Sequence, residues 1–223
     1  LEAEAHRLPV VAEEAVRRNG EEPYRQKLQY VFARLEATLA RNEALKGALE
    51  GVSAGELIPL RRVRPLAEAA AYASGAELWE DLRRVRDSLR HAGSAHAAKT
   101  VERLMRQVAT FGLHLAELDL RQHSERHAAA LGEIHDGLGL DPAWQMLAEA
   151  ERVEWLVAEL FSSRLLVSAE SPLVPRLSAE TIETLNVFRA ARRVLDELSP
   201  DALGTYVVSM TRDVSDLLGP LLL

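Results

Sequence analysis

The sequence has 223 residues, of which 48% are hydrophobic, so it can bury a sizeable core in one large or two small domains. Its net charge of −7 argues against a nucleic-acid partner, which a basic stripe with interleaved aromatic residues would indicate. It has no cysteine, which excludes disulfides and thiolate metal sites. No apolar run approaches the roughly 20 residues that cross a bilayer. We therefore expect a globular, cytoplasmic protein without membrane contacts.

Helical periodicity dominates the chain. A first helix is expected over residues 2–18, although Pro9 within it lacks the amide proton that an interior helical position donates. The next helix should begin at Pro23, since proline suits a first turn. Its apolar residues follow the spacing i, i+3, i+4, i+7, i+11, which predicts one buried face. These residues are Leu28, Val31, Phe32, Leu35 and Leu39.

Four later segments repeat the helical spacing, so at least six helices are expected. They are marked by Trp79, Leu82, Val85 and Leu89; by Val101, Leu104, Met105 and Val108; by Val153, Leu156, Val157 and Leu160; and by Ile182, Leu185, Phe188 and Leu195.

Two short segments break this period and are predicted to be strands. Leu113 to Leu120 is short and apolar, and Gly204 to Met210 is rich in β-forming residues. Each precedes a helix with a candidate cap, Ser124 in the first case and Asp213 or Ser215 in the second. The sequence thus predicts two strand-then-helix units.

The charged residues after the first predicted strand form the candidate site. The carboxyl end of a parallel strand commonly holds the functional residues of a fold. Arg121 offers a planar fork of donors that suits a carboxylate or phosphate, and Asp119 points to the same face of the strand. Asp119 either orients Arg121 or simply pairs with it. Gln122 faces the other way and is expected to cap the next helix or bond to backbone.

Histidines offer a second, weaker pattern. His123 and His127 lie at i and i+4 with Glu125 between them, a spacing that can place two imidazoles around one metal. A zinc protease motif would need glutamate directly after the first histidine and a third ligand, so this interpretation is disfavoured. Ser215 and Asp216 begin the final helix, where they either favour an anion or serve as caps.

Three stretches, in this order along the chain, resemble motifs of phosphoenolpyruvate carboxylases. They are Glu22–Arg25 with Lys27, Leu28, Arg34 and Leu35; Leu118–Gln122 with Ser124 and His127; and Tyr206–Met210 followed by Ser215–Leu218. Two positions depart from the family pattern: His123 replaces a usual glutamate, and Thr211–Val214 replaces a run that usually contains alanine, lysine and proline.

The resemblance implies a mainly α fragment that carries two short strands of a (β/α)8 barrel. Residues 1–110 would form a helical region, and residues 111–223 a partial barrel region with strand–helix units at 111–137 and 204–223. The whole chain would be part of one larger domain, as an internal fragment of a bacterial-type enzyme. A start at Leu1 and an apolar end at Leu221–Leu223 favour the same expectation.

The resemblance also implies a reaction. The parent carboxy-lyase would join phosphoenolpyruvate and bicarbonate into oxaloacetate and phosphate, an anaplerotic carbon-fixing step that feeds the tricarboxylic acid cycle. Carboxyphosphate and the enolate of pyruvate would be intermediates, with Mg²⁺ or Mn²⁺ at the enolate oxygen and arginines on the departing phosphate. Arg121 would support catalysis and bind substrate, with Asp119 as a second substrate-binding residue.

The metal ligands and the remaining catalytic residues are expected elsewhere in a homotetrameric parent. This chain alone would then bind no metal and be inactive. Two alternatives stay open: a non-catalytic helical scaffold or regulatory module in which Asp119 and Arg121 form an internal tie, and a small helical metalloenzyme with His123, Glu125 and His127 as ligands.

Overall fold

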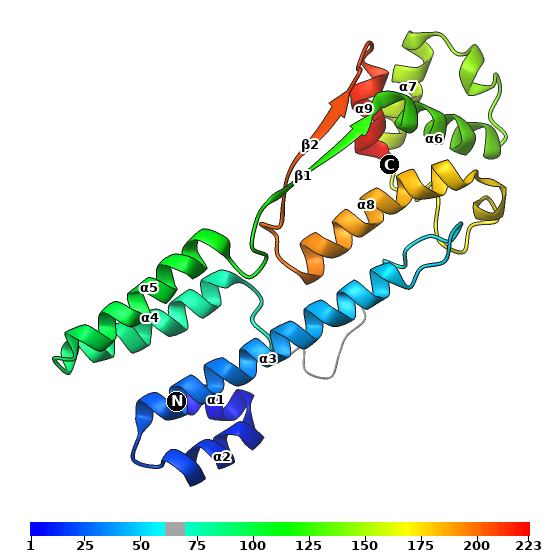
Figure 1. The fold of residues 1–223 in the computed structure, drawn as a ribbon. Coiled ribbons are helices and arrows are strands. Elements are labelled where there is room, and N and C mark those ends of the chain that lie inside the picture. The colour runs from blue at the N-terminus through cyan, green and yellow to red at the C-terminus, as the bar shows by residue number, and fades with distance from the viewer. Residues whose placement is uncertain (61–69) are drawn as a thin grey trace. The chain divides into compact units, whose positions relative to one another are not determined.

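The computed structural model describes residues 1–60 and 70–223, which are mainly helical with two short strands (Figure 1). In chain order the elements are α1 (Glu2–Arg7), α2 (Pro9–Asn19), α3 (Pro23–Glu50), α4 (Gly75–His91), α5 (Ala95–Phe111), β1 (Leu118–His123), α6 (Ser124–Gly137), the 3₁₀ turn η1 (Trp144–Met146), α7 (Glu149–Leu160), the 3₁₀ turn η2 (Val174–Arg176), α8 (Ala179–Glu197), β2 (Leu203–Ser209) and α9 (Ser215–Leu222). Within these ranges, no helix is both long and apolar enough to cross a bilayer.

Two compact units share the chain without following its order. Among the described residues, unit 1 comprises residues 1–48, 70–117 and 196–202, and unit 2 comprises residues 49–60, 118–195 and 203–223. The division into a helical region over 1–110 and a partial barrel region over 111–223 concerns the larger domain and stays a prediction.

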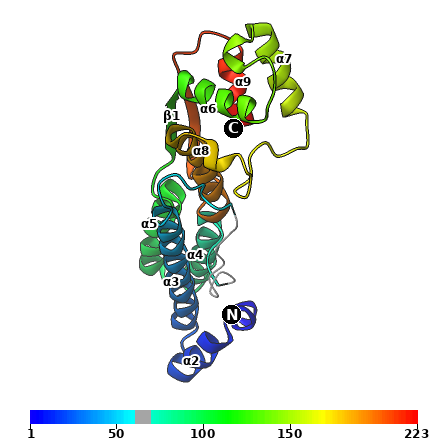
Figure 2. The same cartoon turned by 90° about the vertical axis from the view of Figure 1, so that its right-hand side faces the viewer.

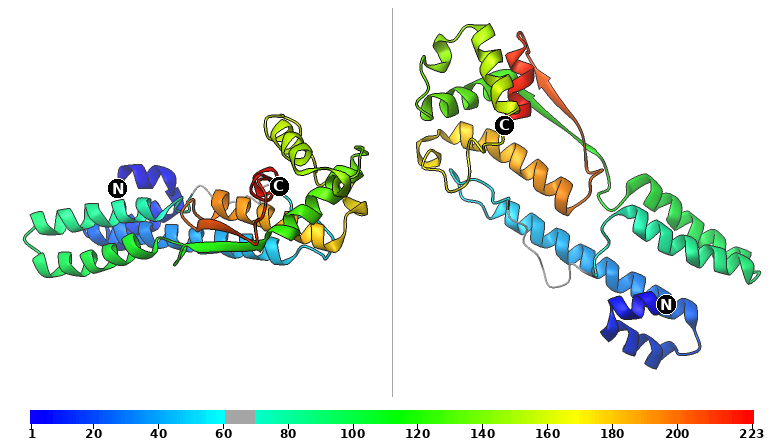
Figure 3. Two further views of the ribbon diagram at one scale, coloured as in Figure 1. Left: turned by 90° about the horizontal axis from the view of Figure 1, so that it is seen from above. Right: turned by 180° about the vertical axis from the view of Figure 1, so that it is seen from behind.

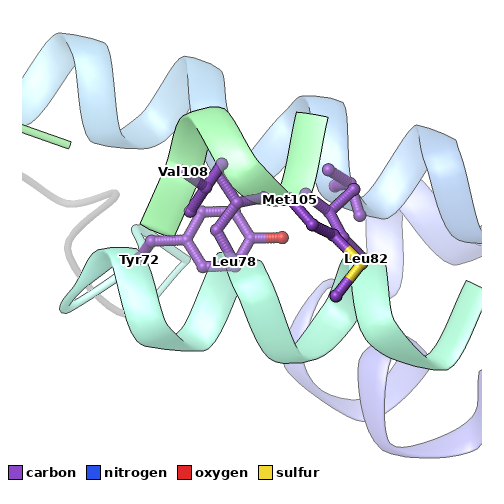
Figure 4. Close-up of a cluster of buried hydrophobic side chains, with 6 residues drawn as sticks. Tyr72, Leu78, Leu82, Met105 and Val108 are labelled. Carbon is purple, nitrogen blue, oxygen red and sulfur yellow. The ribbon is translucent and has the colours of Figure 1, made fainter. Parts of the chain in front are cut away.

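An α-helical hairpin forms the core of unit 1. Helices α4 and α5 lie side by side in every view (Figure 1, Figure 3). The buried cluster comprises Val31, Tyr72, Leu78, Leu82, Met105 and Val108. Figure 4 shows the α4 and α5 members facing one another, with the Tyr72 ring beside Leu78. The predicted buried faces of these two helices are therefore confirmed for most of their residues, but Leu104 of the α5 stripe is wrong, because it is 44% exposed.

The buried face of α3 differs from the predicted apolar stripe. Leu28, Phe32 and Leu39 are 48%, 62% and 59% exposed, whereas Arg34 is only 3% exposed. From the predicted stripe, Val31 is buried in the unit 1 core and Leu35 packs against it. The α3 helix can bury Arg34 at this face because the charge of Arg34 is paired with Glu77 and Asp81.

Asp81 of α4 is at the centre of that pairing. Its Oδ1 accepts from Lys27 Nζ at 2.7 Å, and its Oδ2 accepts from Arg34 Nη1 at 3.2 Å and from the Tyr72 hydroxyl at 2.9 Å. Burial raises the pKa of Asp81, but the hydrogen bonds from Lys27 and Tyr72 and the two cations outweigh it, so the pKa lies below its usual value. Glu4 accepts from Lys27 at 2.8 Å, and Glu77 accepts from Arg34 at 2.6 Å.

A parallel pair of strands positions the candidate site in unit 2. The register places Arg121 opposite Val207 and His123 opposite Ser209. β1 runs directly into α6, and β2 reaches α9 through a short loop (Figure 1, Figure 2). Two apolar clusters support these elements: Leu57, Ile134, Val167, Leu173, Ile182 and Leu185 form one, and Leu131, Trp144 and Leu156 form the other.

The structure corrects three predicted boundaries. Pro9 ends the single helix expected over residues 2–18, because α1 stops at Arg7 and Pro9 begins α2. The first strand begins at Leu118 rather than Leu113, since positive φ values at Gly112 (55°) and Leu115 (70°) turn the chain there. β2 was expected over 204–210 and lies at 203–209.

The predicted helix caps are also different. His123 rather than Ser124 caps α6, and its side chain accepts from the Glu125 amide. Val214 precedes α9 without a side-chain capping bond, so neither Asp213 nor Ser215 has the expected role.

Candidate active site

The carboxyl ends of β1 and β2 lie at the same edge of the sheet, because the strands are parallel. His123 and Ser209 close the two strands at this edge. The turn into α6 and the loop into α9 follow directly, so side chains from both segments gather where parallel α/β folds commonly place ligands.

Arg121 lies within β1, two residues before its end, and its side chain is exposed. In residues 1–60 and 70–223 its guanidinium has no hydrogen-bond or ion-pair partner. Asp119 does not pair with it, because Asp119 Oδ1 accepts from the Thr205 amide of β2 at 3.1 Å. The internal tie between Asp119 and Arg121 is therefore absent, and all five guanidinium donors remain available.

Short polar contacts fix the turn that follows Arg121. Gln122 Oε1 accepts from the His123 amide at 3.0 Å, which confirms the expected backbone contact. Ser124 is buried, and its hydroxyl donates to the Met210 carbonyl just beyond β2 at 2.9 Å. His123 Nδ1 accepts from the Glu125 amide at 3.2 Å. The Ser124 bond connects the two strand ends, and the other two bonds fix the backbone of the turn that follows Arg121.

The loop between β2 and α9 is organised by Asp216. Its Oδ2 accepts from the amides of Arg212 at 2.8 Å and Asp213 at 3.4 Å. Ser215 donates through its amide and hydroxyl to Glu149 of α7 at 2.8 and 2.7 Å. Both residues expected at a helix-terminal anion site or as caps therefore hold the loop instead.

Arg212 is the residue at this edge that sequence reasoning missed as a site residue. Its side chain is 71% exposed, and its only described ion pair is a long 3.8 Å contact to Glu125. Arg212 lies within Thr211–Val214, the stretch that departs from the family pattern. That departure was the signal in the sequence that could have identified Arg212 as a site residue. Arg121 and Arg212 thus give this edge two exposed cations.

His127 lies on the buried side of α6, away from any metal-like grouping. Its Nε2 is 2.7 Å from the Tyr206 hydroxyl, and its ring is 5.9 Å from that of Phe188. Burial lowers the pKa of His127, against the opposing charge of Asp216. His123 instead caps α6, so the metal ligands of the metalloenzyme alternative do not come together. Over the described ranges, no three His, Cys, Asp or Glu side chains could hold an ion.

The comparisons with known proteins agree with the three motifs. The family model described as phosphoenolpyruvate carboxylase matches residues 1–223, the whole chain. This chain belongs to the phosphoenolpyruvate carboxylase family. The phosphoenolpyruvate carboxylases of Synechococcus sp. (strain WH7803) and Roseiflexus castenholzii (strain DSM 13941 / HLO8) are each 40% identical to it, over 226 and 230 residues. That of Synechocystis sp. (strain ATCC 27184 / PCC 6803 / Kazusa) is 38% identical over 226 residues.

All three phosphoenolpyruvate carboxylases are much longer than the chain. Each alignment covers 100% of the chain, but only 22%, 22% and 20% of the relative, respectively. The chain thus spans about a fifth of the length of the curated relatives it matches. Membership of the phosphoenolpyruvate carboxylase family confirms the predicted resemblance and places the chain in a family of carboxy-lyases.

Proposed function

We propose that this chain is a substrate-binding segment of a longer phosphoenolpyruvate carboxylase. The complete enzyme would convert phosphoenolpyruvate and bicarbonate into oxaloacetate and inorganic phosphate, as an anaplerotic step of carbon fixation. The single observation that carries the proposal is the exposed Arg121 guanidinium, which has no described partner and lies near the carboxyl end of a parallel strand. An unpaired guanidinium at such an edge suits a phosphate or carboxylate.

Arg121 would act on charge that develops during the reaction. When bicarbonate attacks phosphorus, the phosphoryl group leaves the enol oxygen, and negative charge grows on both fragments. A guanidinium held at this strand end by the backbone would stabilise this charge with little reorganisation. Asp119 supports this role through the Thr205 amide, which fixes β1 against β2 beneath Arg121. We retain Asp119 as a candidate substrate-binding residue for the same test.

The proposal assigns the divalent metal to another part of the enzyme. Mg²⁺ or Mn²⁺ is the expected cofactor, but the described residues offer no cluster of three ligands, so no step is assigned to a metal in this chain. We further propose that the complete enzyme is a cytoplasmic homotetramer with a (β/α)8 barrel, and that the 223-residue chain alone is inactive.

Substitution of Arg121 in the full-length enzyme tests the proposal. We expect Arg121→Ala to lower kcat/KM for phosphoenolpyruvate by about 10²–10³-fold, since this is the range for removing one preorganised donor to a transition-state anion. Arg121→Lys should recover part of this loss, and Asp119→Asn should have a smaller effect. Oxaloacetate formation with bicarbonate and Mg²⁺ provides the measurement.

Arg103→Ala is the matched control, because Arg103 is an exposed arginine of α5 at a distance in sequence from all three motifs. An active enzyme that tolerates Arg121→Ala would reduce β1 to a scaffold and support the non-catalytic alternative. An inactive, folded full-length protein would contradict the proposed reaction itself.

A further inference from the structure

Unit 2 contains a cavity of about 770 Å³ that lies outside the candidate active site. One wall is a face of α6 made of small residues, with Ala128, Ala129 and Gly132 among them. The other walls come from η1, from Arg152 of α7, and from residues 173–178 around η2. Its volume lies in the range of about 300–1,000 Å³ that is common for small-molecule sites.

Specific contacts hold these walls in place. A Cβ on Gly132 would meet Trp144 Cδ1 at 3.0 Å, so glycine permits the close packing of η1 on α6. Ser178 donates through its amide and hydroxyl to the two Glu133 oxygens at 2.7 and 2.6 Å. The segment before α8 is thereby tied to α6. The cavity is therefore lined by elements that these contacts hold in place.

Arg152 presents an unused donor at this cavity. Its Nη2 donates to the Trp144 carbonyl at 3.3 Å, and its guanidinium carbon lies 5.4 Å from the centre of the Trp144 ring. These contacts orient the guanidinium and leave its Nη1 without a hydrogen-bond partner in the part of the chain that the structure describes. This Nη1 group is the donor that Arg152 offers to an acceptor in the cavity.

The other polar groups of the lining indicate the charge of that acceptor. Arg176 is exposed and has no partner in the part of the chain that the structure describes. Both oxygens of Glu133 already accept from Ser178. Asp136 Oδ1 accepts from the Trp144 amide at 2.7 Å, a bond that lowers the pKa of Asp136. The hydrogen-bonding groups of the lining that remain available to a ligand are therefore chiefly guanidinium donors.

We propose that this cavity binds a small organic anion, whose phosphate or carboxylate group accepts hydrogen bonds from Arg152 and Arg176. Guanidinium groups match both oxyanions in geometry, often with two parallel bonds. The body of the ligand lies against the α6 wall, beside Trp144. Glu133 and Asp136 balance the two guanidinium charges, which favours a ligand with one anionic group over a polyanion.

Calorimetric titration of the full-length protein tests this site with three probes of one shape: phenyl phosphate, benzoate and neutral benzamide. We expect saturable binding of phenyl phosphate or benzoate, and the stronger of the two identifies the anionic group. Benzamide should not bind. Arg176→Gln should raise the dissociation constant of the anion by about tenfold or more, as expected for the loss of a charge-assisted hydrogen bond.

Three further variants distinguish binding in this cavity from binding elsewhere on the protein. Ala129→Phe fills the cavity from an exposed helical position and should abolish binding without changing any charge. Arg121→Gln should leave binding intact, because Arg121 belongs to the candidate active site. Arg103→Gln on α5 removes the same charge elsewhere and should also have no effect. An Arg152→Gln variant is less informative, because it also removes the packing of Arg152 on Trp144.

The proposal is overturned if neither anion binds saturably, if benzamide binds equally well, or if Ala129→Phe and Arg176→Gln both retain full affinity. Binding that disappears in Arg121→Gln and persists in Ala129→Phe would place the anion in the candidate active site instead. Because the readout is binding rather than turnover, the result does not depend on the proposed carboxylase activity.

Discussion

At the scale of single residues, the charged side chains divide into two groups with different roles. Asp81 and Arg34 are buried and paired with each other in unit 1. Arg121 and Arg212 are exposed. In the described ranges Arg121 has no ion pair, and Arg212 has one long ion pair, to Glu125. Paired buried charges stabilise a fold only as a set, whereas unpaired exposed cations are available to a ligand.

Asp81→Ala tests the first group. Its removal leaves Lys27 and Arg34 buried without their shared acceptor, so we expect the free energy of unfolding to fall by about 3–5 kcal/mol. Chemical denaturation of the purified protein measures this loss. The matched control is Asp87→Ala on the same helix, where 44% of the side chain is exposed and about 0–1 kcal/mol is expected. Equal effects of both substitutions would contradict the role of the buried network.

At the scale of elements, sequence patterns predicted helices and their number well, but predicted buried faces less well. The stripe on α3 was wrong at Leu28, Phe32 and Leu39, because the buried face includes Arg34. Its main partner, Asp81, lies 47 residues away, and a local pattern cannot reveal such a pair. Spacing within one helix therefore identifies an apolar face, but not whether charges from elsewhere displace it.

The position of β1 was also predicted incorrectly, although its existence was predicted. Leu113 looked like the start of a buried strand, but it packs against the unit 1 core. The strand itself begins at Leu118, which is 61% exposed, unlike the residues of a buried parallel strand. Arg121 was expected just after the end of this strand, but it lies within β1, because the strand continues to His123.

The approach of α4 to α5 leads to an element-scale prediction. A Cβ on Gly75 would lie 2.9 Å from Gly112 Cα, and backbone cannot yield as a flexible side chain does. We expect Gly75→Ala to destabilise the protein by about 1–3 kcal/mol, as overpacking commonly does. Gly47→Ala on α3 meets no atom within 4 Å and should stabilise it by about 0.5–1 kcal/mol. Denaturation midpoints of the two variants should therefore move in opposite directions, and a shared direction would contradict the packing argument.

At the scale of the whole molecule, the sheet is the feature that most depends on additional chain. Its two described strands each pair on one side only, and parallel sheets are normally covered on both faces. The chain also spans about a fifth of its relatives. These facts support the proposal that further strands flank β1 and β2 in the complete enzyme, with Arg121 at their common edge.

The pH dependence of stability is a property to which both units contribute. The pKa of His127 in unit 2 is lowered in the folded protein, chiefly by burial. The pKa of Asp81 in unit 1 is also lowered, by its hydrogen bonds and cations against the effect of burial. In each case the unfolded state binds the proton more readily, so stability must decrease as the pH falls. The two losses occur in separate windows, because the unfolded pKa values are about 6.5 for histidine and about 3.9 for aspartate.

We therefore expect the thermal midpoint to decrease between about pH 7.5 and pH 5.5, and His127→Gln to flatten this part of the profile. His91→Gln, an exposed position on α4, should leave it unchanged. A second decrease should begin near pH 4 and be smaller in an Asp81→Asn variant, which starts from a lower midpoint. Hydrogen exchange should locate the first loss in α6 and β2, because His127 and Tyr206 bond across them. If α4 opened first instead, the neutral form of His127 would not be what stabilises unit 2 at neutral pH.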